Sequence, residues 1–438
     1  MTEPTRYDAV RASDEIVARL RARHPDLIDL TTDRVLRLLE ALGRPQDRLP
    51  PVIHVAGTNG KGSVCAYLRA MAEAAGLKAH VLTSPHLVRF AERIRVAGTL
   101  ISDAAMADLI DRVEAANAGQ PISFFELTTA IALLAFAETP ADVAIIEVGL
   151  GGRFDASNVF DRPAATVITP VDYDHLEMLG PDLGKIAWEK AGIMRRGVPC
   201  IVARQADEAM AVIEREARKV GAPLTVMGQD FDVWEERGRL VVQMEDQLLD
   251  LPMPSLFGRH QVGNAGLAVA AGLAVPTLGL EPDGIAGAIW PARFQRLTKG
   301  PLARLAADRG ATLWLDGGHN PHAGHALAEA CDILLNRDPR SLALVVGMLS
   351  RKDPQGFLEA FAHLAPRVVA TTFDSPNALT PSQVAEAGRA AGMEVDEAAD
   401  IRAAVELAAG WDSPHILICG GLHFAGDVLA MSPETWPT

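Results

Sequence analysis

Short continuous runs of apolar residues alternate along the chain with longer stretches in which apolar residues recur at helical spacing. Residues 52–56, Val-Ile-His-Val-Ala, form such a run and predict a buried strand. In residues 64–75, which follow a glycine-rich turn, Val64, Leu68 and Met71 recur on one helical face. Further strands are predicted at residues 78–82, 142–148, 164–169, 198–203, 224–227 and 240–244, and further helices at residues 8–23, 32–42, 124–136 and 208–220.

A second strand and helix series begins after residues 290–297, which proline punctuates and which favour an interdomain linker. Strands are predicted at residues 312–315, 342–346, 367–370 and 415–419, and helices at residues 323–335, 354–361, 381–391 and 401–409. Alternation of this kind indicates a doubly wound α/β sheet. We therefore expect an α/β protein with one domain over residues 1–297 and a smaller one over residues 298–438.

Length and composition agree with two folded domains. The chain has 438 residues, too many for one ordinary core, and 49% of them are hydrophobic, with a mean hydropathy of +0.12. The chain has 41 basic and 56 acidic residues, and the resulting net charge of −15 argues against general affinity for nucleic acid or for an anionic membrane. An anionic small molecule would need a local cluster of donors. We expect a monomer.

The cysteines and the N-terminus point to the cytoplasm. Cys65, Cys200, Cys331 and Cys419 lie among apolar residues without metal-ligand spacing, which predicts buried reduced thiols rather than disulfides or a zinc site. The first residues carry charge and no apolar run resembling a signal peptide. The longest apolar helical stretches are much shorter than the roughly 20 residues that span a bilayer.

A glycine-rich turn joins the first predicted strand to its helix. It consists of Gly57, Thr58, Asn59, Gly60, Lys61, Gly62 and Ser63. Glycines there let backbone N–H groups converge, the helix N-terminus adds positive potential, and Lys61 supplies a mobile cation, so the turn predicts a phosphate-binding loop. The general P-loop pattern fits imperfectly, since Val55 replaces its first glycine and Gly62 its hydroxyl residue. A turn that merely joins strand to helix is the alternative.

Polar residues end several of the other predicted strands. Glu147 closes a buried strand before the glycine-rich turn 149–153, and a carboxylate at this place in a phosphate-loop protein is the usual magnesium partner. A structural ion pair is the alternative. Residues 83–87, Thr-Ser-Pro-His-Leu, favour a ligand site or a capped turn, and residues 172–175, Asp-Tyr-Asp-His, a ligand site or helix caps.

Taken together, these motifs resemble those of the Mur ligase superfamily, and within it the folylpolyglutamate synthase and dihydrofolate synthase branch. The resemblance is carried, in chain order, by residues 57–63, 83–86, 174–181, 189–193, 258–265, 291–295 and 316–321. It covers nearly the whole chain. It implies a P-loop central domain of the Mur ligase type, followed by a smaller Rossmann-like C-terminal domain that carries the glutamate-ligase part.

The resemblance also implies a nucleotide site for ATP. Its cofactor-binding residues would be the seven residues of the loop together with three others: Asn264 at the adenine, Arg293 at the phosphates and Asp316 at the ribose. Lys61 of the loop would also be a catalytic residue. His319, a second catalytic residue, would lie near the phosphates. Because the loop lies in the first domain and Asp316 in the second, ATP is expected between them. From the residues alone, helix capping explains Gln261 and Asn264 as well as a ligand role does, and the same holds for Asp316.

A magnesium site and a modified lysine are implied in the same way. Ser84, Glu147 and His175 would ligate Mg²⁺, although histidine is an unusual ligand for this hard cation. Lys190 would be carbamylated, which converts a cation into a carboxylate for a second magnesium. Without the resemblance, Glu189 and Lys190 would be interpreted as a solvated helix face.

For the acid substrate, the resemblance points to Asp29, Phe125 and Glu126. From the residues alone, residues 24–30 are a connector, and aromatic residues at a helix start usually pack in a core. Phe154 and Asp155, after the glycine-rich turn 149–153, are further substrate-binding candidates.

The implied reaction is an ATP-driven amide ligation. A dihydropteroate or folate carboxylate attacks the γ-phosphate, and the amino group of L-glutamate then displaces phosphate from the acyl phosphate. A regulatory P-loop NTPase, a non-catalytic relative, or a Mur-type ligase with a different carboxylate substrate is the alternative. Two positions depart from the family pattern: Ala292 replaces a glycine, and Arg351 replaces an acidic residue. The sequence leaves open which folate form is used.

Overall fold

A computed structural model describes residues 17–18, 20–24, 31–245 and 247–438. The chain divides into two compact units. The first comprises Met1–Pro85, Arg89–Ser255 and Gln261–Ile289, and the second comprises His86–Val88, Leu256–His260 and Trp290–Thr438. Where described, residues 17–18 and 20–23 are helical.

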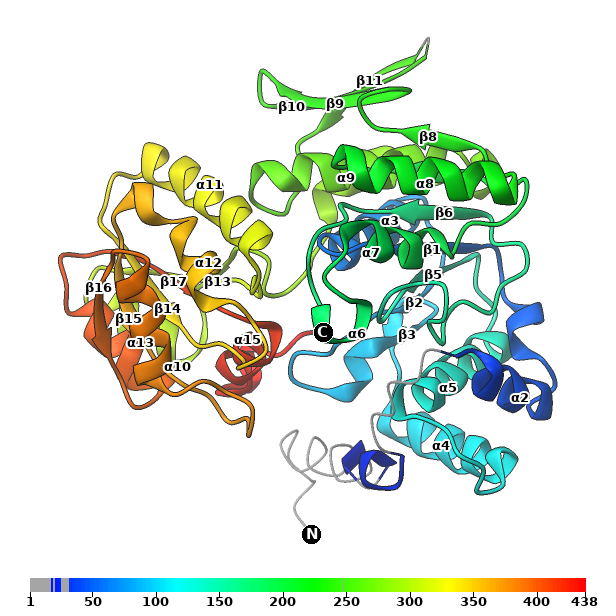
Figure 1. Cartoon of the computed structure of the whole chain (residues 1–438), viewed down its shortest axis with the longest axis horizontal. Coiled ribbons are helices and arrows are strands. Elements are labelled where there is room, and N and C mark those ends of the chain that lie inside the picture. Colours follow the sequence, from blue (N-terminus) through cyan, green and yellow to red (C-terminus); the bar gives the residue numbers. More distant parts are fainter. Residues whose placement is uncertain (1–16, 19, 25–30, 246) are drawn as a thin grey trace. The chain divides into compact units, whose positions relative to one another are not determined.

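An eight-stranded sheet forms the centre of the first unit, with the strand order β4-β3-β2-β5-β1-β6-β7-β8 (Figure 1). The strands are β1 (Val52–Ala56), β2 (Ala79–Leu82), β3 (Ile94–Val96), β4 (Thr99–Leu100), β5 (Val143–Glu147), β6 (Ala165–Ile168), β7 (Cys200–Val202) and β8 (Leu224–Val226). All neighbours from β2 to β8 run parallel, whereas β3 and β4 form an antiparallel edge. The carboxyl ends of β2, β5, β1 and β6 therefore lie side by side.

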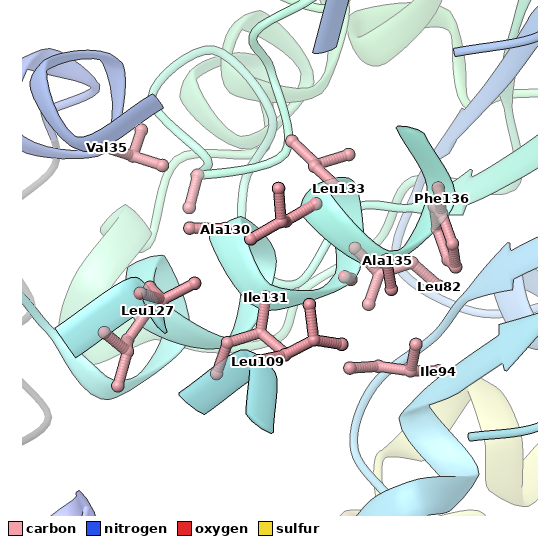
Figure 2. Close-up of a cluster of buried hydrophobic side chains, with 14 of the residues drawn as sticks. Val35, Leu82, Ile94, Leu109, Leu127, Ala130, Ile131, Leu133, Ala135 and Phe136 are labelled. Carbon is pink, nitrogen blue, oxygen red and sulfur yellow. The ribbon is translucent and has the colours of Figure 1, made fainter. Parts of the chain in front are cut away.

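Helices cover this sheet. They are α2 (Asp33–Ala41), α3 (Lys61–Ala74), α4 (Asp103–Asn117), α5 (Phe124–Glu138), α6 (Leu176–Leu179), α7 (Leu183–Ala191), α8 (Asp207–Val220) and α9 (Arg259–Leu273). Helix α5 is apolar on nearly all sides because it is buried between α2, α4 and the sheet. Figure 2 shows this core, in which Ala130 and Ile131 of α5 lie among Val35, Leu109 and Ile94 from the surrounding elements.

A small antiparallel sheet of β9 (Phe231–Glu236), β10 (Arg239–Met244) and β11 (Gln247–Pro252) also belongs to the first unit. It packs on α9, where Gly266 admits the side chain of Val233: a Cβ at Gly266 would lie 2.3 Å from Val233 Cγ2. The short 3-10 helices η1 (Pro45–Arg48), η2 (Phe90–Arg93), η3 (Pro276–Leu278) and η4 (Pro282–Gly287) complete this unit.

The second unit is built on a six-stranded sheet with the order β12-β13-β17-β14-β15-β16. Its strands are β12 (Gln295–Leu297), β13 (Thr312–Leu315), β14 (Leu342–Val346), β15 (Arg367–Ala370), β16 (Glu394–Glu397) and β17 (His415–Cys419). Only β12 is antiparallel to its neighbour. The helices are α10 (Gly300–Ala307), α11 (Pro321–Arg337), α12 (Pro354–Glu359), α13 (Pro381–Ala390), α14 (Ile401–Ala409) and α15 (Leu422–Ala430), with η5 (Ala362–Leu364) and η6 (Pro433–Thr435). Separate cores lie on the two faces of the sheet.

The predicted α/β architecture is confirmed, with local differences. Residues 295–297 of the expected linker pair with β13 as the edge strand β12. Helix α15 was not predicted; it follows Gly420 and Gly421, and its buried residues Ala425, Val428 and Leu429 have helical spacing. The β3–β4 hairpin and α4 were not predicted. All four cysteines are free and buried, and no helix of the described residues has the length and apolar character to cross a bilayer.

Candidate functional site

The glycine-rich loop between β1 and α3 is fastened to the segment that follows β6. The Thr58 N–H donates to Pro170 O at 2.9 Å. The Thr58 hydroxyl donates to Asp172 O at 2.9 Å and accepts from the Asp172 N–H at 3.0 Å. Gly57 and Gly60 have φ values of 144° and 90°, in the region that favours glycine. The strand, turn and helix that a phosphate-binding loop requires are therefore all present.

Gly57 cannot be replaced without moving β6. A Cβ at this position would lie 1.8 Å from Thr169 Oγ1 and 3.0 Å from Thr169 N. We expect Gly57→Ala to lower the free energy of unfolding by about 3 kcal/mol, through backbone strain and overpacking together. Urea denaturation measures this. Gly76→Ala is the matched control, since Gly76 has a φ of 75° and an open surround and should cost only about 1 kcal/mol of strain. Equal losses in the two variants would contradict the close approach.

Two lysines converge on the carbonyl oxygen of Gly57. Lys61 Nζ donates to Gly57 O and to Thr58 O, both at 3.2 Å, and Lys190 Nζ donates to Gly57 O at 2.8 Å. Burial, with the neighbouring Lys61 charge, lowers the pKa of Lys190 to about 7. Lys190 and Glu189 are 5% and 7% exposed, so the alternative interpretation of a solvated helix face is wrong. Both side chains are buried because the loop after β5 packs on α7: a Cβ at Gly152 would lie 2.7 Å from Glu189 O.

Ser84 and Glu147 meet at the ends of the neighbouring parallel strands β2 and β5. The Ser84 N–H donates to Glu147 Oε2 at 3.0 Å, and Glu147 is buried. A buried carboxylate beside a hydroxyl supplies the hard oxygen donors that Mg²⁺ prefers. Among the described residues, no three His, Cys, Asp or Glu side chains are grouped as a metal cage. These residues therefore fit a magnesium ion held by one carboxylate, a hydroxyl and phosphate oxygens.

His175 lies on the segment after β6, separated from β5 in the sheet by β1. Its backbone is left-handed, with a φ of 53°, and it precedes the short helix α6. The ring Nε2 of His175 lies 3.8 Å from Asp174 Oδ2, and the backbone N–H of His175 donates to Asp174 Oδ1 at 2.8 Å. The strand order thus brings His175 to the same edge of the sheet as Glu147 and the glycine-rich loop.

Asn264 of α9 lies against the glycine-rich loop. A Cβ at Gly60 would be 2.5 Å from Asn264 Oδ1. Gln261, one turn earlier, donates to Ser63 Oγ at 3.3 Å and accepts from Asn264 Nδ2 at 3.2 Å. Both residues are buried in α9, and their side chains contact the glycine-rich loop and one another.

Phe125, one of the expected acid-site residues, contacts the loop after β5. A Cβ at Gly149 would lie 2.3 Å from Phe125 Cζ, so this glycine accommodates the ring. Glu126, by contrast, has a structural task. It forms the capping box of α5 with Ser123, and its Oε2 also accepts from Arg34 Nε at 3.1 Å. Asp29 lies outside the described residues.

Phe154 and Asp155 are adjacent in sequence but differ in environment. The Phe154 side chain is partly exposed and its ring centroid lies 6.2 Å from that of Trp188. Asp155 is buried: Oδ2 accepts from the Leu150 N–H at 2.8 Å, and Oδ1 accepts from the Ser157 N–H at 2.9 Å. Burial raises the pKa of Asp155. Its carboxylate therefore closes the glycine-rich turn, while Phe154 presents a ring at the surface.

In the second unit, Arg293, Asp316 and His319 lie together where β13 ends. Asp316 Oδ2 accepts from the Phe294 N–H at 2.7 Å, and Arg293 Nη1 donates to Ala292 O at 2.9 Å. His319 Nδ1 lies 3.0 Å from Gly317 O. Ala292 keeps the left-handed backbone of a glycine, with a φ of 54°, although it carries a side chain.

Three contributors to the site were missed in the sequence. Thr169 packs against Gly57, and Gln205 ties the β6 end by donating to Thr169 O at 3.1 Å. Arg153 Cζ lies 3.9 Å from the centroid of the Trp188 ring, and its guanidinium donates to Trp188 O and to Glu216 Oε2. These contacts hold the turn after β5 against α7. Arg153 stood in a recognised glycine-rich turn, but nothing in the sequence named its partners.

Comparisons with known proteins find matches over most of the chain. Residues 55–272 match the Mur ligase middle domain, and residues 295–421 match the Mur ligase glutamate ligase domain. The chain is 36% identical to the dihydrofolate synthase/folylpolyglutamate synthase of Mycobacterium tuberculosis, over 91% of this chain and 88% of the relative. It resembles the structure of E. coli FolC in complex with DHPP and ADP, with a TM-score of 0.83, 32% identity and coverage of 95% and 96%. A bifunctional folylpolyglutamate synthase/dihydrofolate synthase from Yersinia pestis, complexed with AMPPNP and Mn, has a TM-score of 0.84, 31% identity and coverage of 95% and 97%.

Proposed function

Because the chain belongs to the Mur ligase family, we propose that it is an ATP-dependent ligase that joins L-glutamate to dihydropteroate and to folate polyglutamates. The observation that carries the proposal is the pair of lysines on the Gly57 carbonyl, one in the loop and one buried in α7. A regulatory NTPase needs the first lysine only. The second, Lys190, is suited to conversion into a carboxylate for a metal, which ligation chemistry uses.

The reaction has two balanced steps. A carboxylate oxygen of the pterin-bearing acid attacks the γ-phosphorus of ATP, which forms an acyl phosphate and releases ADP. The amine of glutamate then attacks the acyl carbon, loses a proton and displaces inorganic phosphate. Because both steps bring anions together, the work of the protein is positioning and charge neutralisation.

The proposed roles follow from the contacts of each residue. The ammonium of Lys61 makes two long hydrogen bonds to loop carbonyls and would exchange them for the outer phosphates of ATP. The N–H groups of the loop would bind the phosphates as well. We propose that Arg293 binds the phosphates of ATP and that His319, near these phosphates, assists catalysis. Ser84, Glu147 and His175 would hold magnesium, which neutralises phosphate charge when bound. Phe125 and Phe154 offer rings to a flat pterin.

Phosphate release tests the function. With ATP, magnesium and glutamate present, addition of dihydropteroate or tetrahydrofolate should start phosphate release, and the two acids together establish which reactions the enzyme performs. Phosphate release that is equally fast with neither acid nor glutamate would instead support the regulatory NTPase. Release with a different carboxylate only would support another Mur-type ligase.

Carbamylation of Lys190 is a separate prediction. A neutral amine is needed to attack CO₂, and a pKa of about 7 means that the amine is mostly neutral at pH 8 and mostly protonated at pH 6. Carbon-13 NMR with labelled bicarbonate should show a carbamate signal at pH 8 that weakens as the pH falls through 7. Lys190→Arg is the matched control and should lack the signal. An unchanged signal in that variant would remove Lys190 from the assignment.

We also propose that the protein acts as a monomer in the cytoplasm. Four free, buried cysteines suit a reducing compartment. The net charge of −15 opposes self-association. Light scattering at assay concentration should give the mass of one chain, 46.7 kDa.

A further inference from the structure

His54 is a polar residue inside the otherwise apolar strand β1. In the register of the sheet it lies between Ile146 of β5 and Thr166 of β6, and it is 1% exposed. Its ring meets the Phe160 ring edge to face, with centroids 5.7 Å apart and planes at 85°. Burying an imidazole costs free energy unless the ring forms a hydrogen bond, whereas an apolar residue at this place would carry no such cost.

A chain of hydrogen bonds leads from His54 to the glycine-rich turn after β5. His54 Nε2 lies 3.0 Å from Ser157 Oγ, and Ser157 Oγ donates to Asp155 Oδ1 at 2.5 Å. The other carboxylate oxygen, Asp155 Oδ2, accepts from the Leu150 N–H at 2.8 Å. Ser157 and Asp155 are 0% and 4% exposed, so the whole chain is shielded from solvent.

The direction of these hydrogen bonds follows from the number of protons. Burial raises the pKa of Asp155, but three donors on its oxygens act in the opposite direction and suit the ionised form, which can only accept. Ser157 therefore donates its single proton to Asp155, and its oxygen accepts from His54. Burial and the charge of Arg195 lower the pKa of His54 to about 3, so the ring is neutral and carries its proton on Nε2. Linked donors of this kind polarise one another, which strengthens the short hydrogen bond to the carboxylate.

The turn at the end of this chain carries the aromatic contacts proposed for the acid substrate. Gly149, next to Leu150, accommodates the ring of Phe125. Phe154 immediately precedes Asp155 in the same turn. The hydrogen bonds of Asp155 therefore fix the place of both rings.

The phosphate loop is fastened elsewhere. Thr58 exchanges hydrogen bonds with Asp172 on the segment after β6, and the Thr58 N–H donates to Pro170 O. The backbone of His54 is itself held by β5 and β6 on its two sides. A change of the His54 side chain should therefore act on the turn after β5 and leave the phosphate loop in place.

We propose that His54 and Ser157 are positioning residues for the pterin-bearing acid, and that they act through Asp155 on the turn after β5. The chain of hydrogen bonds anchors this turn to the central strand of the sheet, so that the rings and the carboxylate are in place before the acid binds. The proposal concerns how Asp155 is held, and it is compatible with direct contact between that carboxylate and the acid. It deepens the proposed function, on which it rests.

A purely structural role of His54 makes different predictions. If His54 only fills the core, a side chain of similar volume should lower stability and leave the affinity for both substrates unchanged. If His54 positions the turn, loss of the donor should weaken acid binding selectively. An amide that donates from a similar place should then restore the affinity. The variants H54L and H54Q separate the two cases.

The matched control is His80, a second buried histidine of the same sheet. Its Nε2 lies 3.0 Å from Thr139 O, its Nδ1 accepts from the Ala97 N–H, and its ring stacks on that of Phe136. None of these partners belongs to the turn after β5. H80L should therefore lower the free energy of unfolding without changing the affinity for the acid.

The experiment measures two affinities by calorimetry. One is the Kd for dihydropteroate and for tetrahydrofolate in the presence of a non-hydrolysable ATP analogue, and the other is the Kd for the analogue alone. We expect H54L and S157A each to weaken acid binding about tenfold and to change the Kd for the analogue less than about twofold. H54Q should stay within about threefold of wild type. Because both residues act through one chain, H54L/S157A should lose no more than about twofold beyond the larger single loss.

Three results would overturn the proposal: an unchanged acid Kd in H54L, equal losses of acid and nucleotide affinity, or the same loss of acid affinity in H80L. A wild-type chain that binds neither acid would end the proposed function, and this inference with it. Acid binding that is identical in wild type and in all His54 and Ser157 variants would end the inference alone.

Nitrogen-15 NMR of histidine-labelled wild-type protein covers the case in which H54L and S157A do not fold. The His54 ring, assigned by the loss of its signals in H54Q, should carry its proton on Nε2. These signals should shift when the acid binds and much less when the ATP analogue binds. A proton on Nδ1 instead, or signals that the acid leaves unchanged, would contradict the proposed chain.

Discussion

Lys61→Ala should lower kcat by about a thousandfold or more, because it removes the cation that we propose neutralises the outer phosphates as negative charge gathers in the transition state. The same change should leave the fold intact. Lys61 is only half-buried, and its ammonium makes two long hydrogen bonds, at 3.2 Å, to carbonyls of its own loop. Losing them should cost about 1–2 kcal/mol of unfolding free energy at most.

Initial rates of ADP formation, with urea denaturation alongside, check the prediction for Lys61. Lys219→Ala is the matched control, because Lys219 is an exposed lysine near the end of α8 in the same unit. It should leave both quantities unchanged. A Lys61→Ala variant that turns over within a factor of ten of wild type would exclude this lysine from phosphoryl transfer.

Glu147→Gln should have the second largest effect. The amide keeps an oxygen that can accept from the Ser84 N–H, so β2 and β5 should remain joined at this point. It loses the negative charge that a hard divalent cation requires. We expect kcat to fall at least about a hundredfold and the magnesium concentration for half-maximal rate to rise, since the metal contributes several kcal/mol of charge stabilisation.

A magnesium titration of the rate distinguishes this effect from general damage. Glu235→Gln, at an exposed position of β9, serves as the control and should show the wild-type titration. If Glu147→Gln kept the wild-type dependence on magnesium, Glu147 would be a structural carboxylate and not a metal ligand.

Much of the fold could be predicted from the sequence because most strands are covered on both faces. Such strands are continuous apolar runs, as residues 52–56 and 342–346 are, and all residues of β1 and β14 are buried. The β3–β4 hairpin was missed because its strands have three and two residues and carry Arg95 and Thr99. Helix α4 does have a signal in the sequence, the N-cap residue Ser102.

For the site, the sequence was informative wherever a polar residue ends a strand. The family resemblance implied that Ser84 and Glu147 share a site, and the two residues are in contact because parallel strands place their carboxyl ends at one edge of the sheet. Burial of Lys190 could not be predicted from helical periodicity, because it depends on the turn after β5 lying across α7. The same holds for Asn264, which meets Gly60 across some 200 residues of chain.

The central claim is that ATP drives amide formation through an acyl phosphate, and transfer of oxygen-18 tests it most directly. Dihydropteroate with oxygen-18 in its carboxylate is incubated with ATP, magnesium and glutamate. The masses of the released phosphate and of the product are then measured by mass spectrometry. The account predicts that, in the first turnover, each phosphate released carries one labelled oxygen and each pterin acid consumed gains one glutamate. Phosphate that takes its new oxygen from water, with no glutamate added, would contradict it.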